Sequence, residues 1–283
     1  MKERIMVNEK IPMAATVVLW HNNKVFLIQR HKKSGFMGKA HVFPGGRLDD
    51  EDIQKATTLE PKIQNLCLQR CPMLKEPISA TAICWAALRE TAEESGIFIC
   101  KTKEGDWLNI EEQKQAQIAL RSGRRFNDII HENQWRLAFE VLYPVAWWLT
   151  PPIEKKRFNT FFFTLLLTQE TAVAPDPHET HGGQWWSLKT IFEAYAKKAV
   201  FLAPPTFSVL EDLKEASTFE KFVQVNRPHS VICPQVELNK NGTLYFFLPG
   251  HPKHSETNKK PATGARIALK MPQGGCLSSV FMD

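Results

Sequence analysis

Residues 85–97 read WAALRETAEESGI, and this stretch constrains the fold more than any other part of the chain. Its apolar positions fall on one side of a helix, and Gly96 is a typical residue to follow a helix end, so we predict a helix over residues 80–95. At 3.6 residues per turn, the opposite side gathers three carboxylates on one face: Glu90, Glu93 and Glu94. Such a face is either a solvated helix surface with ordinary ion pairs or a site for a hard cation such as magnesium.

The rest of the chain alternates short apolar runs with helical stretches in no regular order. Two β-branched runs joined by His-Asn-Asn predict a hairpin, and a glycine pair, Gly45-Gly46, follows the next short run. Further strands are expected at 97–99, 142–152, 157–167 and 244–250, further helices at 110–135, 187–199 and from 204 onward, and a loop at 171–186. This order favours an α+β fold with a mixed sheet.

Composition narrows the class of protein. Hydrophobic residues make up 43% of the 283 residues, enough for a sizeable core. A net charge of +6 is not a nucleic-acid-binding signature and suits a small anionic substrate at least as well as a polymer, so no nucleic-acid partner is expected. We read neither a secretory signal nor a membrane-spanning run, and the six cysteines lack zinc-site spacing, so a cytoplasmic location without membrane contact is expected.

The segment Arg-Glu-Thr-Ala-Glu-Glu-Ser-Gly-Ile at residues 89–97 resembles the second half of the Nudix box, with Thr91 as the weakest match. The first half is similar at Gly46 but departs in two ways: 42 residues separate Gly46 from Arg89, and the acid six places after Gly46 is Asp52, not glutamate. An insertion at this point resembles the Nudix branch that includes coenzyme A diphosphatases. The likeness extends over about residues 10–250, through LYPVAWWLTPP, KRFNTFFF, HETHGGQWWSL and FLAPPTFSVLEDL.

The resemblance implies a Nudix fold, which is a mixed β-sheet in an α/β/α sandwich. We expect a Nudix domain over residues 1–250, enlarged by an insertion at about 50–80 and a helical C-terminal extension at about 187–226. Residues 251–283 are expected to form a tail with one strand-like segment.

The resemblance also implies roles for individual residues. Glu90, Glu93 and Glu94 would hold Mg²⁺ or Mn²⁺, with Glu93 and Glu94 serving catalysis, and Arg89 would orient Glu93. Glu179 would act as base or extra ligand, while Gly45, Gly46, Arg30 and Arg157 would meet the substrate. The sequence differs from the branch at two positions that bear on the assignment of the base. Asn159 stands where the branch has an aspartate, and Gly182 stands where a second acid often lies.

The implied reaction is hydrolysis of a nucleoside diphosphate linked to a second group, with coenzyme A or acyl-CoA cleaved to 3′,5′-ADP and (acyl)phosphopantetheine. ADP-ribose, NDP-sugars and dinucleotides are alternative substrates, and a catalytically inactive nucleotide-binding module is an alternative of another class. A homodimer is a further expectation.

Three other features have structural interpretations as well as functional ones. His178 and His181 suggest zinc but lack further ligands with the required spacing, so surface histidines are favoured. The tryptophan pairs at 147–148 and 185–186 are favoured as core, although they could stack on a base. Basic residues around Arg30 form either a phosphate-facing patch or a solvated hairpin tip.

Overall fold

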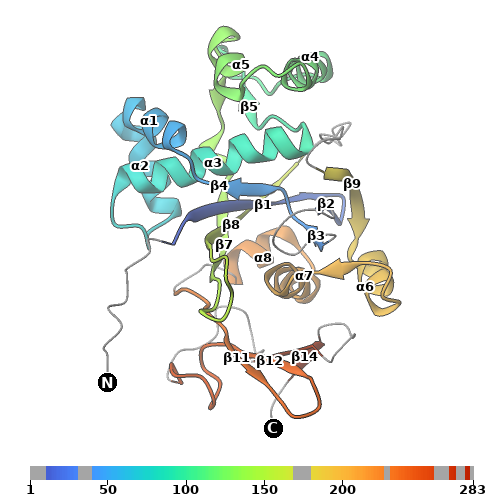
Figure 1. Ribbon diagram of the computed structural model, residues 1–283. Coiled ribbons are helices and arrows are strands. Elements are labelled where there is room, and N and C mark those ends of the chain that lie inside the picture. The colour runs from blue at the N-terminus through green and yellow to red at the C-terminus, as the bar shows by residue number, and fades with distance from the viewer. Residues whose placement is uncertain are drawn as a thin grey trace.

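The centre of the computed structural model is an eight-stranded mixed β-sheet (Figure 1). The structure describes residues 11–30, 40–167, 180–225, 230–257, 268–271 and 278–280. The strand order is β10-β3-β2-β1-β8-β7, with β4 paired to β1 and β9 paired to β2. The strands are β1 (Met13–His21), β2 (Lys24–Arg30), β3 (Ala40–Val42), β4 (Gly45–Arg47), β7 (Tyr143–Leu149), β8 (Asn159–Leu166), β9 (Thr180–Ser187) and β10 (Phe201–Leu202).

The sheet begins with the predicted hairpin of β1 and β2. Asn22 and Asn23 occupy its tip with φ of 46° and 58°, the left-handed conformation that a two-residue turn between antiparallel strands requires. Strand β1 then pairs in parallel with β8, and eight residue pairs between Met13–Asn159 and Trp20–Leu166 fix the register. Residues of β1 are buried on both faces, so the sheet needs a helical layer on each side.

One face of the sheet is covered by α3 (Pro77–Ser95), which confirms the helix predicted at 80–95. A proline at its first turn starts the helix, and Gly96 ends it with φ of 74°. The insertion at 50–80 forms two more helices beside it, α1 (Asp50–Thr58) and α2 (Pro61–Arg70). Alternate side chains of β1 and β2, including Val17 and Phe26, pack against these helices.

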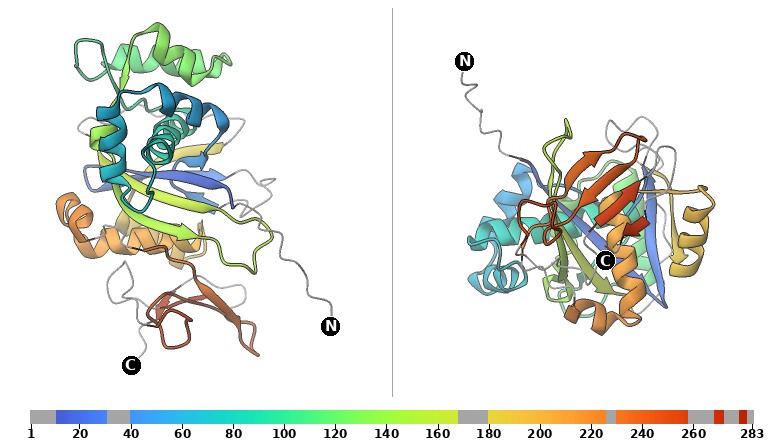
Figure 2. Two further views of the ribbon diagram at one scale, coloured as in Figure 1. Left: turned by 90° about the vertical axis from the view of Figure 1, so that its left-hand side faces the viewer. Right: turned by 90° about the horizontal axis from the view of Figure 1, so that it is seen from below.

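The other face carries α6 (Leu188–Ala196), α7 (Pro204–Ala216) and α8 (Phe219–Val225), as Figures 1 and 2 show. The intervening alternate residues of β1 and β2, such as Val18 and Leu27, pack with Phe207 and Leu210 of α7 in a second core cluster. These helices were expected as a C-terminal extension. They instead form the second layer of the sandwich, and β10 between α6 and α7 pairs with β3 of the main sheet.

A second sheet lies beyond α7 (Figure 2). It has four strands: β11 (Gln235–Leu238), β12 (Leu244–Phe247), β13 (Ala268–Met271) and β14 (Ser278–Val280). Because β12 pairs with β13, this sheet joins chain segments on both sides of the domain boundary predicted near residue 250, and that boundary stays a prediction. Ile232 links the two sheets, since its N–H donates to Trp147 O at 2.7 Å and its carbonyl accepts from Leu149 N at 2.9 Å.

Three local predictions are corrected. Residues 97–99 are buried but lie outside any strand, because the chain pairs only from Cys100 in β5 (Cys100–Lys101), against β6 (Arg136–Leu137). The helix expected at 110–135 is two helices, α4 (Ile110–Arg121) and α5 (Phe126–Glu132). A short 3₁₀ helix, Phe139–Val141, leads into β7.

The third correction concerns the loop predicted at 171–186. Residues 180–186 belong to β9, which pairs antiparallel with β2, while 171–179 lie outside the described residues. The glycines that suggested a loop have a packing role instead. A Cβ at Gly183 would lie 2.0 Å from Cζ of Phe26, so only glycine fits at this place in the strand.

Within the described residues, no helix is long and apolar enough to cross a membrane.

Candidate functional site

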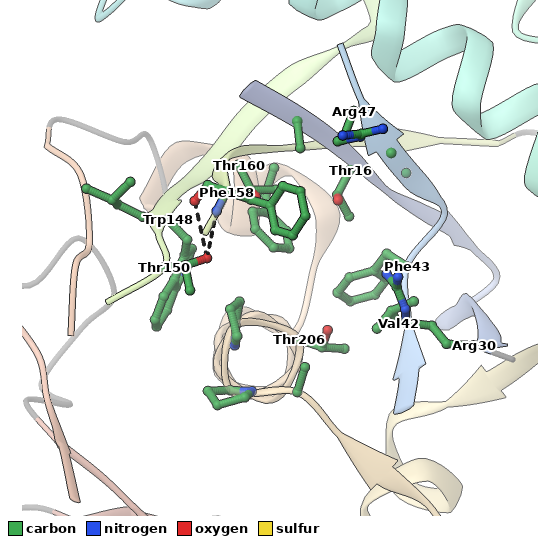
Figure 3. A pocket seen from close by; sticks show the side chains of 18 of the residues that line it. Thr16, Arg30, Val42, Phe43, Arg47, Trp148, Thr150, Phe158, Thr160 and Thr206 are labelled. Carbon is green, nitrogen blue, oxygen red and sulfur yellow. Dashed lines mark hydrogen bonds between the residues drawn. The ribbon is translucent and has the colours of Figure 1, made fainter. Parts of the chain in front are cut away.

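A cavity of about 690 Å³ opens between the main sheet, the start of α7 and the second sheet (Figure 3). Its walls differ in chemistry. On one side, around β2, β4 and α3, lie the glycine pair, both positively charged lining residues and two carboxylates: Arg30, Gly45, Gly46, Arg47, Glu90 and Glu94. On the other, around β7, β8 and the second sheet, most lining residues are apolar, among them Trp148, Leu149, Pro151, Phe158, Phe162, Pro234 and Phe246.

The polar side is built from the contact between the glycine pair and α3. Gly45 donates its N–H to Oε2 of Glu94 at 2.7 Å, which joins β4 to the carboxylate face of the helix. A Cβ at Gly46 would lie 2.3 Å from the carboxylate of Glu90. Glycine is therefore required where the backbone of β4 approaches the helix.

Arg89 organises the carboxylates around it. Its Nη1 donates to Glu90 Oε1 at 2.9 Å and to Glu93 Oε2 at 2.8 Å, so the predicted pair with Glu93 is present. Its Nε and Nη2 donate to the two oxygens of Asp52, both at 2.8 Å. Asp52 is 0% exposed, so a buried two-pronged ion pair ties α1 to α3.

Burial and charge act in opposite directions on this pair. Burial raises the pKa of the Asp52 carboxyl, and the hydrogen bonds and positive charge of Arg89 oppose that rise. Burial disfavours the charged guanidinium, yet the hydrogen bond to Asp52 and the charges of the surrounding carboxylates raise the pKa of Arg89 above its ordinary value. Arg89 is therefore positively charged at any physiological pH, and it holds its carboxylate partners in place.

Arg30 and Arg47 supply positive charge to the cavity. Arg30, at the end of β2, has its Nε buried, and this Nε has no hydrogen-bond partner among the described residues. A buried donor of this kind favours an acceptor from a ligand. Arg47 follows Gly46 directly, its side chain lines the cavity, and its carbonyl accepts from Nη2 of Arg89 at 3.1 Å.

Other predicted residues lie elsewhere. Glu93 does not line the cavity. Arg157 does not line it either; its Nε donates to Thr150 O at 2.9 Å and so supports the rim. Asn159 accepts from Nε1 of Trp147. Glu179 and His178 lie outside the described residues, as does the basic segment 31–39.

The tryptophan pairs divide between core and cavity. Trp147 stacks on Phe161 at 5.4 Å between ring centroids, in agreement with the structural interpretation. Trp148 is 3% exposed and packs in the core, but it also lines the cavity. Trp185 and Trp186 pack against the two core clusters.

Several lining residues were missed from the sequence. Arg47 could have been found from its place next to Gly46, and Thr206 from the Pro-Pro-Thr start of a helix. Pro234 and Phe246 carry no local signal, because only the placement of the second sheet brings them to the cavity.

The donor set determines whether a metal ion would fit. Within the described part of the chain, no three His, Cys, Asp or Glu side chains are grouped so that they could hold a metal ion by themselves. Glu90 and Glu94 nevertheless face the same cavity as Arg30 and Arg47. Mg²⁺ typically takes one or two carboxylates together with phosphate oxygens and water, so this site fits a divalent ion that arrives with a phosphorylated ligand.

Comparisons with known proteins show which family the chain resembles. The family model described as the NUDT19 Nudix domain matches residues 73–213, about half of the chain. The chain is 28% identical to the acyl-coenzyme A diphosphatase NUDT19 of Xenopus laevis, a match that covers 74% of this chain and 63% of the relative. For the human protein of the same name the identity is 27%, with 65% and 58% covered. The chain therefore spans less than two thirds of the length of these relatives.

A solved structure supports the fold. A Nudix hydrolase from Alicyclobacillus acidocaldarius superposes with a TM-score of 0.60 over 76% of this chain and 96% of its own, at 22% sequence identity. The predicted α+β sandwich with a mixed sheet is confirmed.

Proposed function

We propose that this chain, which belongs to the Nudix hydrolase family, hydrolyses the diphosphate linkage of coenzyme A or its acyl esters. The observation that carries the proposal is the polar side of the cavity, where two arginines and two glutamates lie with a glycine pair. Neither glycine has room for a side chain. That arrangement suits a diphosphate, because the arginines match its charge and the close contact of β4 with α3 keeps the two glutamates at the same cavity.

Each residue of the polar side has a role in the proposed reaction. Arg30 and Arg47 bind the diphosphate oxygens, and the short Gly45–Glu94 hydrogen bond holds β4 against α3. Glu90 and Glu94, together with Glu93 on the same helix face, as the resemblance implies, would hold Mg²⁺ or Mn²⁺. Such an ion, when bound, would supply positive charge to the diphosphate and would make a water molecule more acidic. Arg89 positions Glu90 and Glu93 through its two hydrogen bonds from Nη1. Glu179 is retained as a candidate base.

The choice of coenzyme A rests on two supports. The relatives from Xenopus laevis and Homo sapiens, matched across 74% and 65% of this chain, are named acyl-coenzyme A diphosphatases. In addition, the second wall of the cavity is largely apolar, which suits a long organic arm better than the hydroxyl-rich sugar of ADP-ribose or an NDP-sugar. Water attack on the diphosphate would release 3′,5′-ADP and phosphopantetheine or its acyl ester. The cytoplasmic location and the homodimer stay predictions.

The proposal is tested by incubating the purified chain with coenzyme A and excess magnesium and identifying the products by mass. We expect 3′,5′-ADP and phosphopantetheine, no turnover with EDTA, and recovery on re-addition of Mg²⁺ or Mn²⁺. Turnover of ADP-ribose or a dinucleotide without turnover of coenzyme A would mean that coenzyme A is not the substrate and that the hydrolysed compound is. Absence of turnover with all of them would favour the binding-module alternative.

Two substitutions test the metal-binding face. Glu93→Gln and Glu94→Gln are each expected to fold normally and to lower kcat/KM by about 100-fold, because each neutralises a carboxylate where charge must be balanced in the transition state. Glu104→Gln, at an exposed turn, is the matched control and should match wild type. Full activity in both site variants would mean that the metal site is assigned wrongly.

A further inference from the structure

The start of α7 forms part of the cavity floor. Ala203, Pro204, Pro205 and Thr206 all line the cavity, and Figure 3 shows this helix end-on below it. Prolines in the first turn have no N–H to offer, and Ala203 makes no side-chain cap. The first free backbone N–H of this helix is therefore that of Thr206, and it belongs to the positive end of the helix dipole.

The side chain of Thr206 adds a second donor at the same place. The residue is 3% exposed, and it lines the cavity with its hydroxyl directed inward (Figure 3). Within the described residues this hydroxyl makes no hydrogen bond. At the start of two other helices a polar side chain is already used: Ser187 caps α6 and Asn109 caps α4 through a side-chain oxygen. The hydroxyl of Thr206, in the first turn of α7, has no such bond to a described residue. Because the hydroxyl faces the cavity and no group in the described part of the chain bonds to it, Thr206 can donate to a ligand atom that accepts a hydrogen bond.

The surroundings of Thr206 determine which acceptor fits. Phe158, Phe162, Pro234 and Phe246 supply apolar walls, and the hydroxyl of Thr150 is already bonded to the backbone of Phe158. No Lys or Arg lines the cavity from β7, β8, α7 or the second sheet in the described chain, whereas Glu154 lines it. A phosphate bound here would lose its water without gaining a cation, and it would lie on the same side of the cavity as the carboxylate of Glu154. Both effects oppose phosphate binding. A neutral hydrogen-bond acceptor avoids the loss of charge solvation and the repulsion.

We propose that Thr206 forms a second subsite, which binds a neutral carbonyl oxygen, of an amide or thioester, in the apolar arm of the substrate. The inference rests on the proposed function for the position of the diphosphate, which Arg30 and Arg47 hold on the polar side. The arm then crosses the cavity, its carbonyl accepts from Thr206, and its carbon chain packs against Pro234 and Phe246. Both of these residues lie beyond the segment that the family model matches.

The test is calorimetric titration of the full chain with coenzyme A, whose arm carries amide carbonyls, and with ADP, which lacks the arm. EDTA is present, so no turnover occurs. Thr206→Val keeps the shape and removes the donor, and we expect it to weaken coenzyme A binding about tenfold while leaving ADP binding unchanged. Thr206→Ser keeps the hydroxyl and should restore most of the affinity. Thermal unfolding verifies that the variants are folded.

A second pair of variants tests the apolar wall. Phe246→Leu should weaken binding of a long-chain acyl-CoA more than that of coenzyme A. Tyr245→Leu, on the other face of β12, is the matched control and should change neither.

Each result has a definite meaning. Equal affinity of wild type and Thr206→Val for coenzyme A would overturn the subsite and leave the proposed hydrolysis standing. Equal weakening of coenzyme A and ADP would place Thr206 against the nucleotide and also overturn it, as would failure of wild type to bind coenzyme A. Selective weakening without hydrolysis when magnesium is supplied would support the subsite and refute the proposed reaction.

Discussion

Arg89 shows how one residue can serve both the fold and the site. Two of its nitrogens bond to the buried Asp52, and its third bonds to the carboxylates of Glu90 and Glu93. The insertion is thus connected through a single guanidinium to the carboxylate face of α3. Asp52 also caps the start of α1, because it exchanges hydrogen bonds with Asp49. Asp52, which stands where the Nudix pattern has a glutamate, therefore holds Arg89 in place beside the site.

Asp52→Asn is expected to lower the free energy of unfolding by about 3 kcal/mol, because it removes the charged partner of a buried guanidinium. Urea unfolding at pH 7 measures this change. Activity should fall as well, since the asparagine NH2 cannot accept from Arg89 and one of the hydrogen bonds that orient the guanidinium is lost. Asp50→Asn, an exposed residue in the same helical turn, is the control and should cost about 0.5 kcal/mol or less. Equal effects of the two would contradict a supporting role for Asp52.

At the scale of elements, β9 shows why a glycine-rich segment need not be a loop. Gly183 pairs with Ile28 of β2, and the ring of Phe26 fills the space where a side chain at Gly183 would lie. Residues 178–184 are rich in histidine, glycine and polar side chains, a composition typical of loops. Local propensity therefore favoured a loop where residues 180–187 form a strand. Pairing with β2 and the close approach of Phe26 outweigh that propensity.

Gly183→Ala should destabilise the protein by about 1–3 kcal/mol, because the added methyl group forces Phe26 or β9 to move. Thermal and urea unfolding would detect the loss. In a Phe26→Leu background the same substitution should cost less, since the smaller side chain leaves room. Additive costs in this double-mutant cycle would show that the two residues do not interact.

At the scale of the whole molecule, the cavity is assembled from segments that lie far apart in the chain. Arg30, Gly46, Glu90, Trp148, Thr206 and Phe246 come from six separate elements, and Ile232 links the second sheet to β7. The second sheet thereby completes the apolar wall, although it lies outside the segment matched by the family model. A ligand that fills the cavity would contact both sheets at once.

Coenzyme A binding should therefore slow hydrogen exchange in β12 and around Ile232, as well as in β4, because a ligand that contacts both sheets opposes local opening. Exchange mass spectrometry with and without coenzyme A measures this effect. The β5–β6 pair, whose residues do not line the cavity, supplies the internal control. Protection of β4 without protection of β12 would mean that the ligand does not reach the second sheet.

The sequence by itself determined the features that depend on neighbouring residues. The period of α3, its end at Gly96, the carboxylate face, the Asn-Asn hairpin and the Ser187 cap all follow from contacts within a few positions, so local physics is sufficient to predict them. The order of elements along the chain also indicated an α+β fold with a mixed sheet, and the Nudix resemblance implied the sandwich. The Nudix resemblance rests on these same local patterns.

Tertiary structure alone decided which of these features meet. It paired Glu93 with Arg89 outside the cavity lining, placed residues 180–187 in β9, made the expected helical extension a layer of the sandwich, and brought Thr206, Pro234 and Phe246 to one wall. These outcomes depend on the packing of side chains that are distant in the sequence. Such contacts leave no periodic or spacing signal, because their partners are selected by shape and burial in the folded chain.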